Sequence, residues 1–283
     1  MRILRTLTDL RAWRNSLPAT SSVGFVPTMG ALHAGHMRLV EECRAGSDVV
    51  VVSIFVNPLQ FGPNEDLSRY PRPFERDSAL CERAGVDVIF APEAASFYAP
   101  DHATFVNVDG LDRHLCGAAR PGHFRGVCTV VLKLFNAVRP RRAWFGKKDI
   151  QQALILKRMV SDLAVDVEMV LSDTVRETDG PSAGLALSSR NQYLSDDERG
   201  RATALHRGLQ RAKAAITTGE RDVTALAAMI RSEIEASNPT RIDYIEIVSQ
   251  ARLEPIARVD GPAVMAVAVF YGTTRLIDNE LVE

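Results

Sequence analysis

Residues 25–40, FVPTMGALHAGHMRLV, join a strand-like apolar run to a helix-like run through a turn that carries two histidines. His33 and His36 stand three residues apart, with Gly30 and Gly35 close by. Histidine is scarce in this chain, with six in 283 residues. Two of them in one turn indicate either coincidence or a site, and the surrounding pattern has to decide between these.

The pattern around the turn is an alternation of short β-branched runs with helical periodicity. Residues 48–56, DVVVVSIFV, are nearly all apolar, which is typical of a strand buried on both faces of a parallel sheet. Repeated βαβ units predict an α/β fold with a Rossmann-like, doubly wound parallel sheet. Further strands are predicted over 22–27, 86–91, 142–145 and 165–171, and helices over 37–45, 74–84, 124–137 and 149–163.

The pattern changes after about residue 171. The stretch 195–215, SDDERGRATALHRGLQRAKAA, predicts a helix that opens with Ser195 as N-cap and Glu198 at the capping-box spacing. A second helix is predicted near 223–236, followed by strands over 241–248, 263–270 and 274–277. We therefore expect two domains, 1–171 and 172–283, the second of them a small C-terminal α+β domain.

Composition narrows the class of protein. The formal net charge is −1, which argues against a broad nucleic-acid surface but leaves room for a small anionic ligand. The N-terminus lacks the apolar core of an export signal, and no apolar run reaches about 18 residues. These features predict a cytoplasmic protein with no nucleic-acid or membrane partner.

The cysteines show no pattern of a metal or redox site. Cys43, Cys81, Cys116 and Cys128 are widely spaced, and no pair has C-x-x-C spacing. Thiols in a reducing compartment are the simpler interpretation.

Residues 28–35 are the predicted strand-to-helix turn, and ligands of doubly wound sheets bind beside such turns. Gly30 and Gly35 allow close backbone approach and positive φ, and the following helix points N–H groups and a positive dipole end at the turn. An anion is the expected ligand, and His33 and His36 could both donate to it as charge develops. Zinc is the weaker interpretation, because H-x-x-H lacks its usual Glu and no third ligand is near.

The turn resembles the HIGH motif of the nucleotidyltransferase superfamily, which includes class I aminoacyl-tRNA synthetases. Within it, PTMGALHAGH resembles the signature of the pantothenate synthetase (pantoate–β-alanine ligase) family. Four further stretches resemble that family in the family's order: SIFVNPLQFGPNEDLSRYPR (53–72), RPGHFRGV (120–127), FGKKDIQQ (145–152) and LSSRNQYL (187–194). The resemblance covers roughly residues 20–195, and the remainder fits the family's small C-terminal domain in length.

The resemblance implies an activity. It is the ATP-dependent condensation of pantoate with β-alanine to pantothenate through a pantoyl adenylate, with release of AMP and pyrophosphate. It also implies ATP as a substrate, Mg²⁺ as its companion ion, and a homodimer. Domain 1–171 would then be the nucleotidyltransferase domain that binds ATP and pantoate.

The resemblance also implies site residues, with His33, His36, Lys148 and Arg190 as catalytic contacts of the phosphates. The implied ATP-binding residues are Met29, Gly30, Ala31, Leu32, His33, Ala34, Gly35, His36, Gly146, Lys147, Lys148, Asp149, Val175, Leu187, Ser188, Ser189 and Arg190. The implied pantoate and β-alanine residues are Gln60, Gln152, Pro27 and Thr28.

Some of these assignments have independent support from residue chemistry, and some stay open. Gly146 permits a turn before two lysines, which suits phosphate, but local sequence does not choose between Lys147 and Lys148. Hydroxyls and a guanidinium over 188–190 also suit a triphosphate. Gln151 competes with Gln152, and the family's spacing favours Gln152. Asp77 is a weak candidate for contact with Mg²⁺, because a surface helical carboxylate is the simpler interpretation.

Two loops have unusual lengths. The loop 57–73 is about 17 residues long, a length typical of a lid. In DGPSAGLALSSRN, residues 179–191, four residues are extra relative to the family, either 181–184 or 180–183, and should bulge outward. Three alternative functions stay open. They are a nucleotidylyltransferase acting on another small acid or phosphate, a synthetase-like RNA-binding protein, and a catalytically silent nucleotide-binding module.

Overall fold

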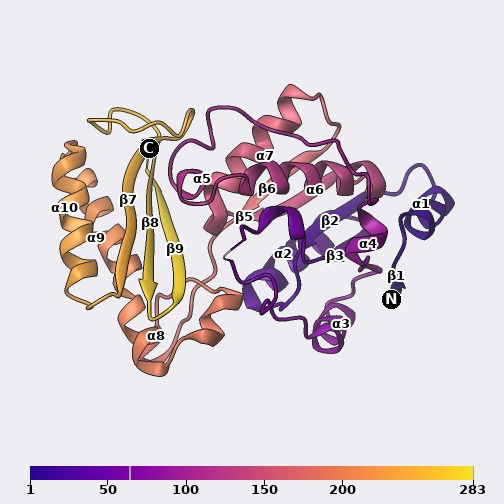
Figure 1. The fold of residues 1–283 in the computed structure, drawn as a ribbon, viewed down its shortest axis with the longest axis horizontal. Coiled ribbons are helices and arrows are strands. Elements are labelled where there is room, and N and C mark those ends of the chain that lie inside the picture. The colour runs from indigo at the N-terminus through magenta and orange to yellow at the C-terminus, as the bar shows by residue number, and fades with distance from the viewer. Residues whose placement is uncertain (64, 283) are drawn as a thin grey trace. The chain divides into compact units, whose positions relative to one another are not determined.

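The computed structural model describes residues 1–63 and 65–282, which form two compact units (Figure 1). The main division lies between residues 173 and 174, two residues after the predicted boundary. Two short segments of the predicted first domain, Asp109–Arg120 and Lys148–Gln151, group instead with the second unit. The side chain of Gln151 joins these two segments, since it donates hydrogen bonds to the carbonyls of Leu111 and His114.

The first unit contains a six-stranded, wholly parallel sheet in the order β1-β4-β3-β2-β5-β6, as the alternating pattern predicted. Its strands are β1 Arg2–Leu4, β2 Val23–Thr28, β3 Val49–Ile54, β4 Val88–Phe90, β5 Arg142–Gly146 and β6 Glu168–Ser172. The apolar pattern did not predict β1, which has only three residues. It also started β6 too early, because the chain leaves the preceding helix through Ala164 with a positive φ of 49°.

Helices cover both faces of this sheet. Alternate residues of β2 show the two layers, since Val26 joins the core beneath α2 whereas the Phe25 ring lies 6.4 Å from the Phe135 ring of α6. The helices of the first unit are α1 Leu7–Ser16, α2 Ala34–Gly46, α3 Phe74–Arg83, α4 Ala94–Phe97, α6 His123–Val138 and α7 Ile150–Asp162, whose first two residues group with the second unit. Packing on both faces explains why β3 is apolar at nearly every position.

The second unit is built on an antiparallel sheet of β7 Arg241–Ser249, β8 Ala263–Tyr271 and β9 Thr274–Val282. Its helices are α5 Cys116–Ala119, α8 Asp196–Ala202, α9 Ala204–Thr217 and α10 Val223–Glu235. Leu209 of α9 and Ile230 of α10 share a core with Val267 of β8. The predicted α+β class is confirmed.

Two predicted elements of this unit had wrong bounds. The strand predicted over 274–277 runs on to Val282, because its polar end is paired. There, Glu280 binds Lys213 and Gln210 of α9, with donor–acceptor distances of 2.5 and 2.9 Å. The helix predicted from Ser195 is divided at Thr203, where α8 ends and α9 begins.

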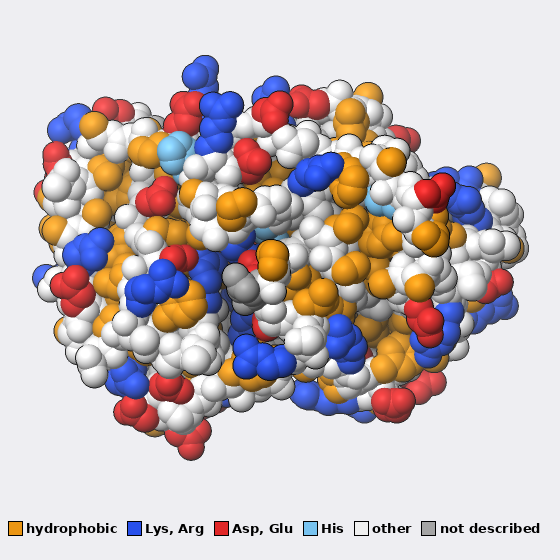
Figure 2. All heavy atoms as spheres, in the orientation of Figure 1, with side chains coloured by type: hydrophobic (Ala, Val, Ile, Leu, Met, Phe, Trp, Pro, Cys, Tyr) orange, Lys and Arg blue, Asp and Glu red, His pale blue; other side chains and the backbone are white. Residues whose placement is uncertain are grey.

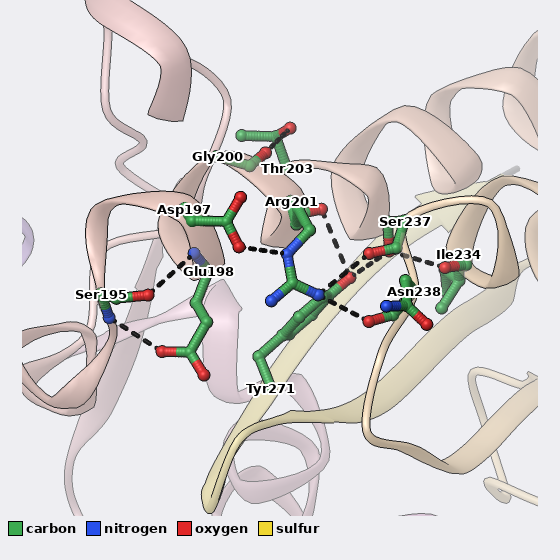
Figure 3. Close-up of polar contacts among 10 residues, drawn as sticks. All are labelled: Ser195, Asp197, Glu198, Gly200, Arg201, Thr203, Ile234, Ser237, Asn238 and Tyr271. Carbon is green, nitrogen blue, oxygen red and sulfur yellow. Dashed lines mark hydrogen bonds and ion pairs between the residues drawn. The ribbon is translucent and has the colours of Figure 1, made fainter.

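The predicted capping box at the start of α8 is present (Figure 3). The hydroxyl of Ser195 accepts the backbone N–H of Glu198 at 3.2 Å, and the Glu198 carboxylate accepts the N–H of Ser195 at 2.8 Å. At the other end of α8, Arg201 donates to the Asp197 carboxylate and to the Asn238 carbonyl. The Arg201 guanidinium also lies over the Tyr271 ring, 5.6 Å from its centroid.

The distribution of charged side chains on the surface agrees with the formal net charge of −1. Figure 2 shows one face of the molecule, on which Lys and Arg side chains are interspersed with Asp and Glu. Among the helices described here, none is long and apolar enough to cross a membrane.

Replacing Ser195 with Ala should lower the free energy of unfolding by about 1 kcal/mol, because the orphan N–H of Glu198 loses its acceptor. Urea denaturation followed by circular dichroism measures this. Ser232→Ala is the matched control, since Ser232 is exposed inside α10, where Ala is the better helix former. Equal effects of the two changes would contradict the role of the cap.

Candidate active site

The histidine turn (residues 28–36) connects β2 to α2 at the carboxyl edge of the parallel sheet. Its backbone passes through Gly30 with φ +83° and Ala31 with φ +50°. A Cβ at Gly30 would lie 3.1 Å from a carboxylate oxygen of Asp77, so both the conformation and the space favour glycine. Gly35 differs from the prediction, since it lies within the first turn of α2 and has no positive φ.

Helix α2 begins three residues before its predicted start because the two histidines cap it. His33 is the N-cap, and its Nδ1 accepts the N–H of Gly35 at 3.2 Å. Nδ1 of His36 accepts the N–H of His33 at 3.4 Å, which completes a capping box. The usual N-cap residues are Ser, Thr, Asp and Asn, so the sequence pattern did not indicate this helix start.

This capping arrangement sets the tautomer of both imidazoles. Because Nδ1 accepts a backbone N–H in each ring, the neutral form carries its proton on Nε2. The ring centroids are 4.0 Å apart, so His33 and His36 form one unit at the positive end of the α2 dipole. The pair is suited to donate hydrogen bonds to a developing negative charge.

The backbone of the turn is held by Asp77 from α3. Its two carboxylate oxygens accept the N–H groups of Ala31 and Leu32 at 2.7 and 2.8 Å, and Asp77 is only 1% exposed. Thr28 adds a second anchor, because its hydroxyl accepts the N–H of Gly30 and donates to the carbonyl of Ser53.

This geometry corrects the interpretation of Asp77. The side chain is not a surface carboxylate, and burial raises its pKa more than its backbone hydrogen bonds lower it. Both oxygens accept backbone N–H groups, so Asp77 supports the turn, and its contact with Mg²⁺ stays a prediction. In residues 1–63 and 65–282, no group of three or more His, Cys, Asp and Glu side chains could hold a metal ion.

Gln60 lies beside the histidine turn, in the loop that follows the neighbouring strand β3. It ends a short 3₁₀ helix, η1 Pro58–Gln60, and is 8% exposed. Its Nε2 lies 3.2 Å from Sδ of Met29, in the turn itself. The remainder of the loop 57–73 includes the ring of Tyr70 packed against Phe61, and its residue 64 lies outside the described residues.

The structure distinguishes the two glutamines that follow β5. Gln151 is 5% exposed, and its amide donates to the carbonyls of Leu111 and His114 at 2.9 and 2.8 Å. That side chain has a structural task. Gln152 is half-buried and stays the candidate for the substrate.

The two lysines after Gly146 also differ. Nζ of Lys147 lies 2.6 Å from the carboxylate of Asp173, and this ion pair lowers the pKa of Asp173. Lys148 forms no ion pair within the part of the chain described here, while its carbonyl accepts the amide of Asn279 at 2.7 Å. This difference favours Lys148 as the cation for a ligand. Asp149 is exposed at the end of η2 Lys147–Asp149.

In the second unit, the predicted phosphate loop opens another 3₁₀ helix, η4 Ser189–Tyr193. Ser188 is its N-cap, with its hydroxyl accepting the N–H of Arg190 at 3.3 Å. The N–H of Leu187 donates to the carbonyl of Val175 at 3.0 Å, so these two predicted ATP residues are neighbours.

Comparison with known proteins identifies the family. A family profile described as pantoate-beta-alanine ligase matches residues 2–281. The chain belongs to the pantoate–β-alanine ligase family.

Named relatives agree with this membership. Pantothenate synthetase of Thermotoga neapolitana is 50% identical over 282 residues, covering 99% of both chains. The crystal structure of pantothenate synthetase from Thermus thermophilus has a TM-score of 0.92 and 47% identity over 99% of both chains. Pantoate-beta-alanine ligase from Francisella tularensis, solved with beta-gamma ATP and beta-alanine, has a TM-score of 0.81 and 33% identity, covering 99% of this chain and 97% of that one.

Residues 181–184, which we expect to be extra relative to the family, form the tip of a closed hairpin. Glu177 and Leu185 are joined by a backbone hydrogen bond of 2.9 Å, and Glu177 accepts the N–H of Gly184 at 2.8 Å. Gly180 and Gly184 take positive φ of 72° and 96°, which allows the tight path. The segment therefore closes the hairpin end and leaves the hydrogen bond between Val175 and Leu187 intact.

The sequence pattern did not indicate the residues that support Gln60. The missed residues are Asn57 and Tyr98, which bind one another, and His123, whose Nδ1 lies 2.8 Å from the Gln60 carbonyl. Asn57 and His123 stand inside the quoted motifs, but Tyr98 lies outside all of them. Its only signal was an aromatic residue soon after a strand.

Asp77→Asn should lower the free energy of unfolding by about 1–3 kcal/mol, because an amide group would turn a donor toward one of two buried N–H groups. Equilibrium urea unfolding checks this value. Asp101→Asn is the control, since Asp101 is exposed. An Asp77→Asn protein as stable as the control would show that the carboxylate does not hold the turn.

Proposed function

We propose that this chain condenses pantoate with β-alanine at the expense of ATP, forming pantothenate, AMP and pyrophosphate. Full-length membership in the pantoate–β-alanine ligase family carries this conclusion. The imidazole pair at the N-terminus of α2 supports it, since such a pair suits a reaction at phosphate.

The reaction has two steps. A carboxylate oxygen of pantoate forms a bond to the α-phosphorus of ATP, the bond to the β-phosphate oxygen breaks, and pyrophosphate leaves. The amine of β-alanine then attacks the acyl carbon of the pantoyl adenylate, loses a proton, and AMP leaves. Neither step needs a covalent nucleophile from the protein, so positioning and charge stabilisation are its contributions.

Our proposed roles follow the chemistry of each group. His33 and His36 donate from Nε2 to phosphate oxygens, where negative charge builds up in the first step. Lys148 and Arg190 neutralise phosphate charge, and Ser188 donates its hydroxyl. The remaining turn and loop residues, Met29, Gly30, Ala31, Leu32, Ala34, Gly35, Gly146, Lys147, Asp149, Val175, Leu187 and Ser189, line the nucleotide.

The pantoate side of the site is proposed to use Gln60 and Gln152, with Pro27 and Thr28 at the end of β2. Ala31 and Leu32 contact ATP through atoms other than their N–H groups, because those donate to Asp77. Mg²⁺ would enter with ATP on phosphate and water oxygens and supply charge neutralisation. We further propose that the enzyme is a cytoplasmic homodimer.

The family membership supports the ligase over a nucleotidylyltransferase that keeps the adenylate as its product. Mass spectrometry of a reaction with ATP, pantoate and β-alanine separates them. The ligase makes pantothenate and releases AMP only when β-alanine is present. Accumulation of an adenylate that β-alanine does not consume would contradict the proposal.

Replacing His36 with Ala should lower kcat for adenylation by about 10²-fold or more, the scale for losing one transition-state donor. Pyrophosphate release measures it. His36→Gln is the matched control for the capping role, because Gln at this position can still accept the N–H of His33. We expect His36→Gln to restore stability but not turnover, and near-normal turnover in it would contradict the assignment.

Lys148→Ala should reduce pyrophosphate release much more than Lys147→Ala. Lys147 already pairs with Asp173, which is exposed, so its loss removes a surface ion pair of small value. Adenylation assays on both purified variants decide the matter. Equal losses would mean that the lysine assignment is wrong or that both bind phosphate.

A further inference from the structure

Asn57 has a side-chain orientation that the backbone around it dictates. The residue is 1% exposed, its Nδ2 donates to the carbonyl of Gly126 at 3.1 Å, and its Oδ1 accepts the N–H of Leu59 at 3.3 Å. A carbonyl only accepts and an N–H only donates, so the reversed amide would lose both bonds. The polarity of Asn57 is therefore set.

Asn57 passes this polarity on to Gln60. Its Nδ2 also donates to Oε1 of Gln60 at 3.0 Å. A reversed Gln60 would place two NH₂ groups against one another, so Oε1 must face Asn57 and Nε2 must face the other way. Nε2 lies 3.2 Å from Sδ of Met29, at the histidine turn. The backbone of Gln60 is held as well, by His123 at its carbonyl.

Tyr98 completes the arrangement from outside the motifs. Its hydroxyl donates to Oδ1 of Asn57 at 2.9 Å, and burial raises the pKa of Tyr98, so the hydroxyl keeps its proton. The ring is packed against Phe97, 5.0 Å away, and under Nζ of Lys133, 4.9 Å away. That amino group donates to the carbonyl of Phe97 at 2.5 Å, which keeps it over the two rings.

The approach of α6 to this loop depends on a missing side chain. A Cβ at Gly126 would lie 2.2 Å from the Leu59 carbonyl oxygen, so only glycine lets the helix backbone reach Asn57. Fixed backbone groups therefore hold the Asn57 part of the polar chain Tyr98–Asn57–Gln60, and aromatic packing holds the Tyr98 ring.

We propose that Tyr98 and Asn57 are positioning residues that make Gln60 present its amide N–H, a hydrogen-bond donor, to an acceptor oxygen of pantoate. The inference rests on the proposed function, in which Gln60 contacts pantoate. It adds that Gln60 is the hydrogen-bond donor in that contact, and it adds two residues that act through Gln60. A donor at this position selects an anionic or hydroxy-acid substrate and disfavours a substrate that offers only a donor there.

Gln60→Glu and Gln60→Ala together test whether Gln60 donates the hydrogen bond to pantoate. In the Glu variant, Asn57 would bind one oxygen of the introduced carboxylate, and the other oxygen would direct its charge at the pantoate carboxylate. We expect KM for pantoate to rise about 10-fold in the Ala variant, the scale for losing one hydrogen bond to a charged group, and further in the Glu variant. A Glu variant that binds pantoate as well as the parent would overturn the proposal.

Tyr98→Phe tests the positioning role, because it keeps the ring and removes only the hydroxyl. We expect KM for pantoate to rise about 3- to 10-fold, with KM for ATP and β-alanine unchanged. Tyr271→Phe is the matched control, since the Tyr271 hydroxyl is also buried and binds Ser237 Oγ at 2.6 Å in the second unit (Figure 3). That variant should lose stability without a change in pantoate KM.

The possible outcomes distinguish the positioning role of Tyr98 from the contact between Gln60 and pantoate. If Gln60→Ala leaves the pantoate KM unchanged, the proposed contact between Gln60 and pantoate fails. If Gln60→Ala raises that KM while Tyr98→Phe lowers only the melting temperature, the contact stands and the positioning role is overturned.

Discussion

The contact on which the histidine turn depends is the pair of hydrogen bonds from the N–H groups of Ala31 and Leu32 to the buried Asp77 carboxylate. The turn carries consecutive positive φ angles at Gly30 and Ala31, a backbone path that needs external support. Asp77 supplies it from α3, after the long loop. With the turn held, His33 can cap α2, and the cap in turn sets which nitrogen of each imidazole carries the proton.

The same principle operates around Gln60, where fixed backbone groups determine the polarity of side chains. The Gly126 carbonyl and the Leu59 N–H orient Asn57, and Asn57 orients Gln60. In both places, a group that can only donate or only accept removes the ambiguity of an amide or an imidazole. A reaction that relies on positioning benefits from such preorganised donors, since they need no reorganisation when charge develops.

Sequence pattern predicted most of the first unit because a parallel sheet covered on both faces leaves a clear signature. Apolar runs such as β3 alternate with helical periods, and this alternation predicts parallel strands joined by helices. The ends of helices and strands were less predictable. The start of α2 was missed since histidines replace the usual cap residues, and the end of β9 was missed since Glu280 has partners on α9 that a linear pattern does not show.

The sequence by itself determined the fold class, the capping box at Ser195 and the family, because these depend on local pattern and motif order. Only the tertiary structure decided that Asp77 is a buried support, that Gln151 is structural, and that Lys147 is paired. Those roles arise from contacts between residues far apart in the chain. A carboxylate, an amide or an ammonium group looks the same in a sequence whether it faces solvent, a ligand or a backbone N–H.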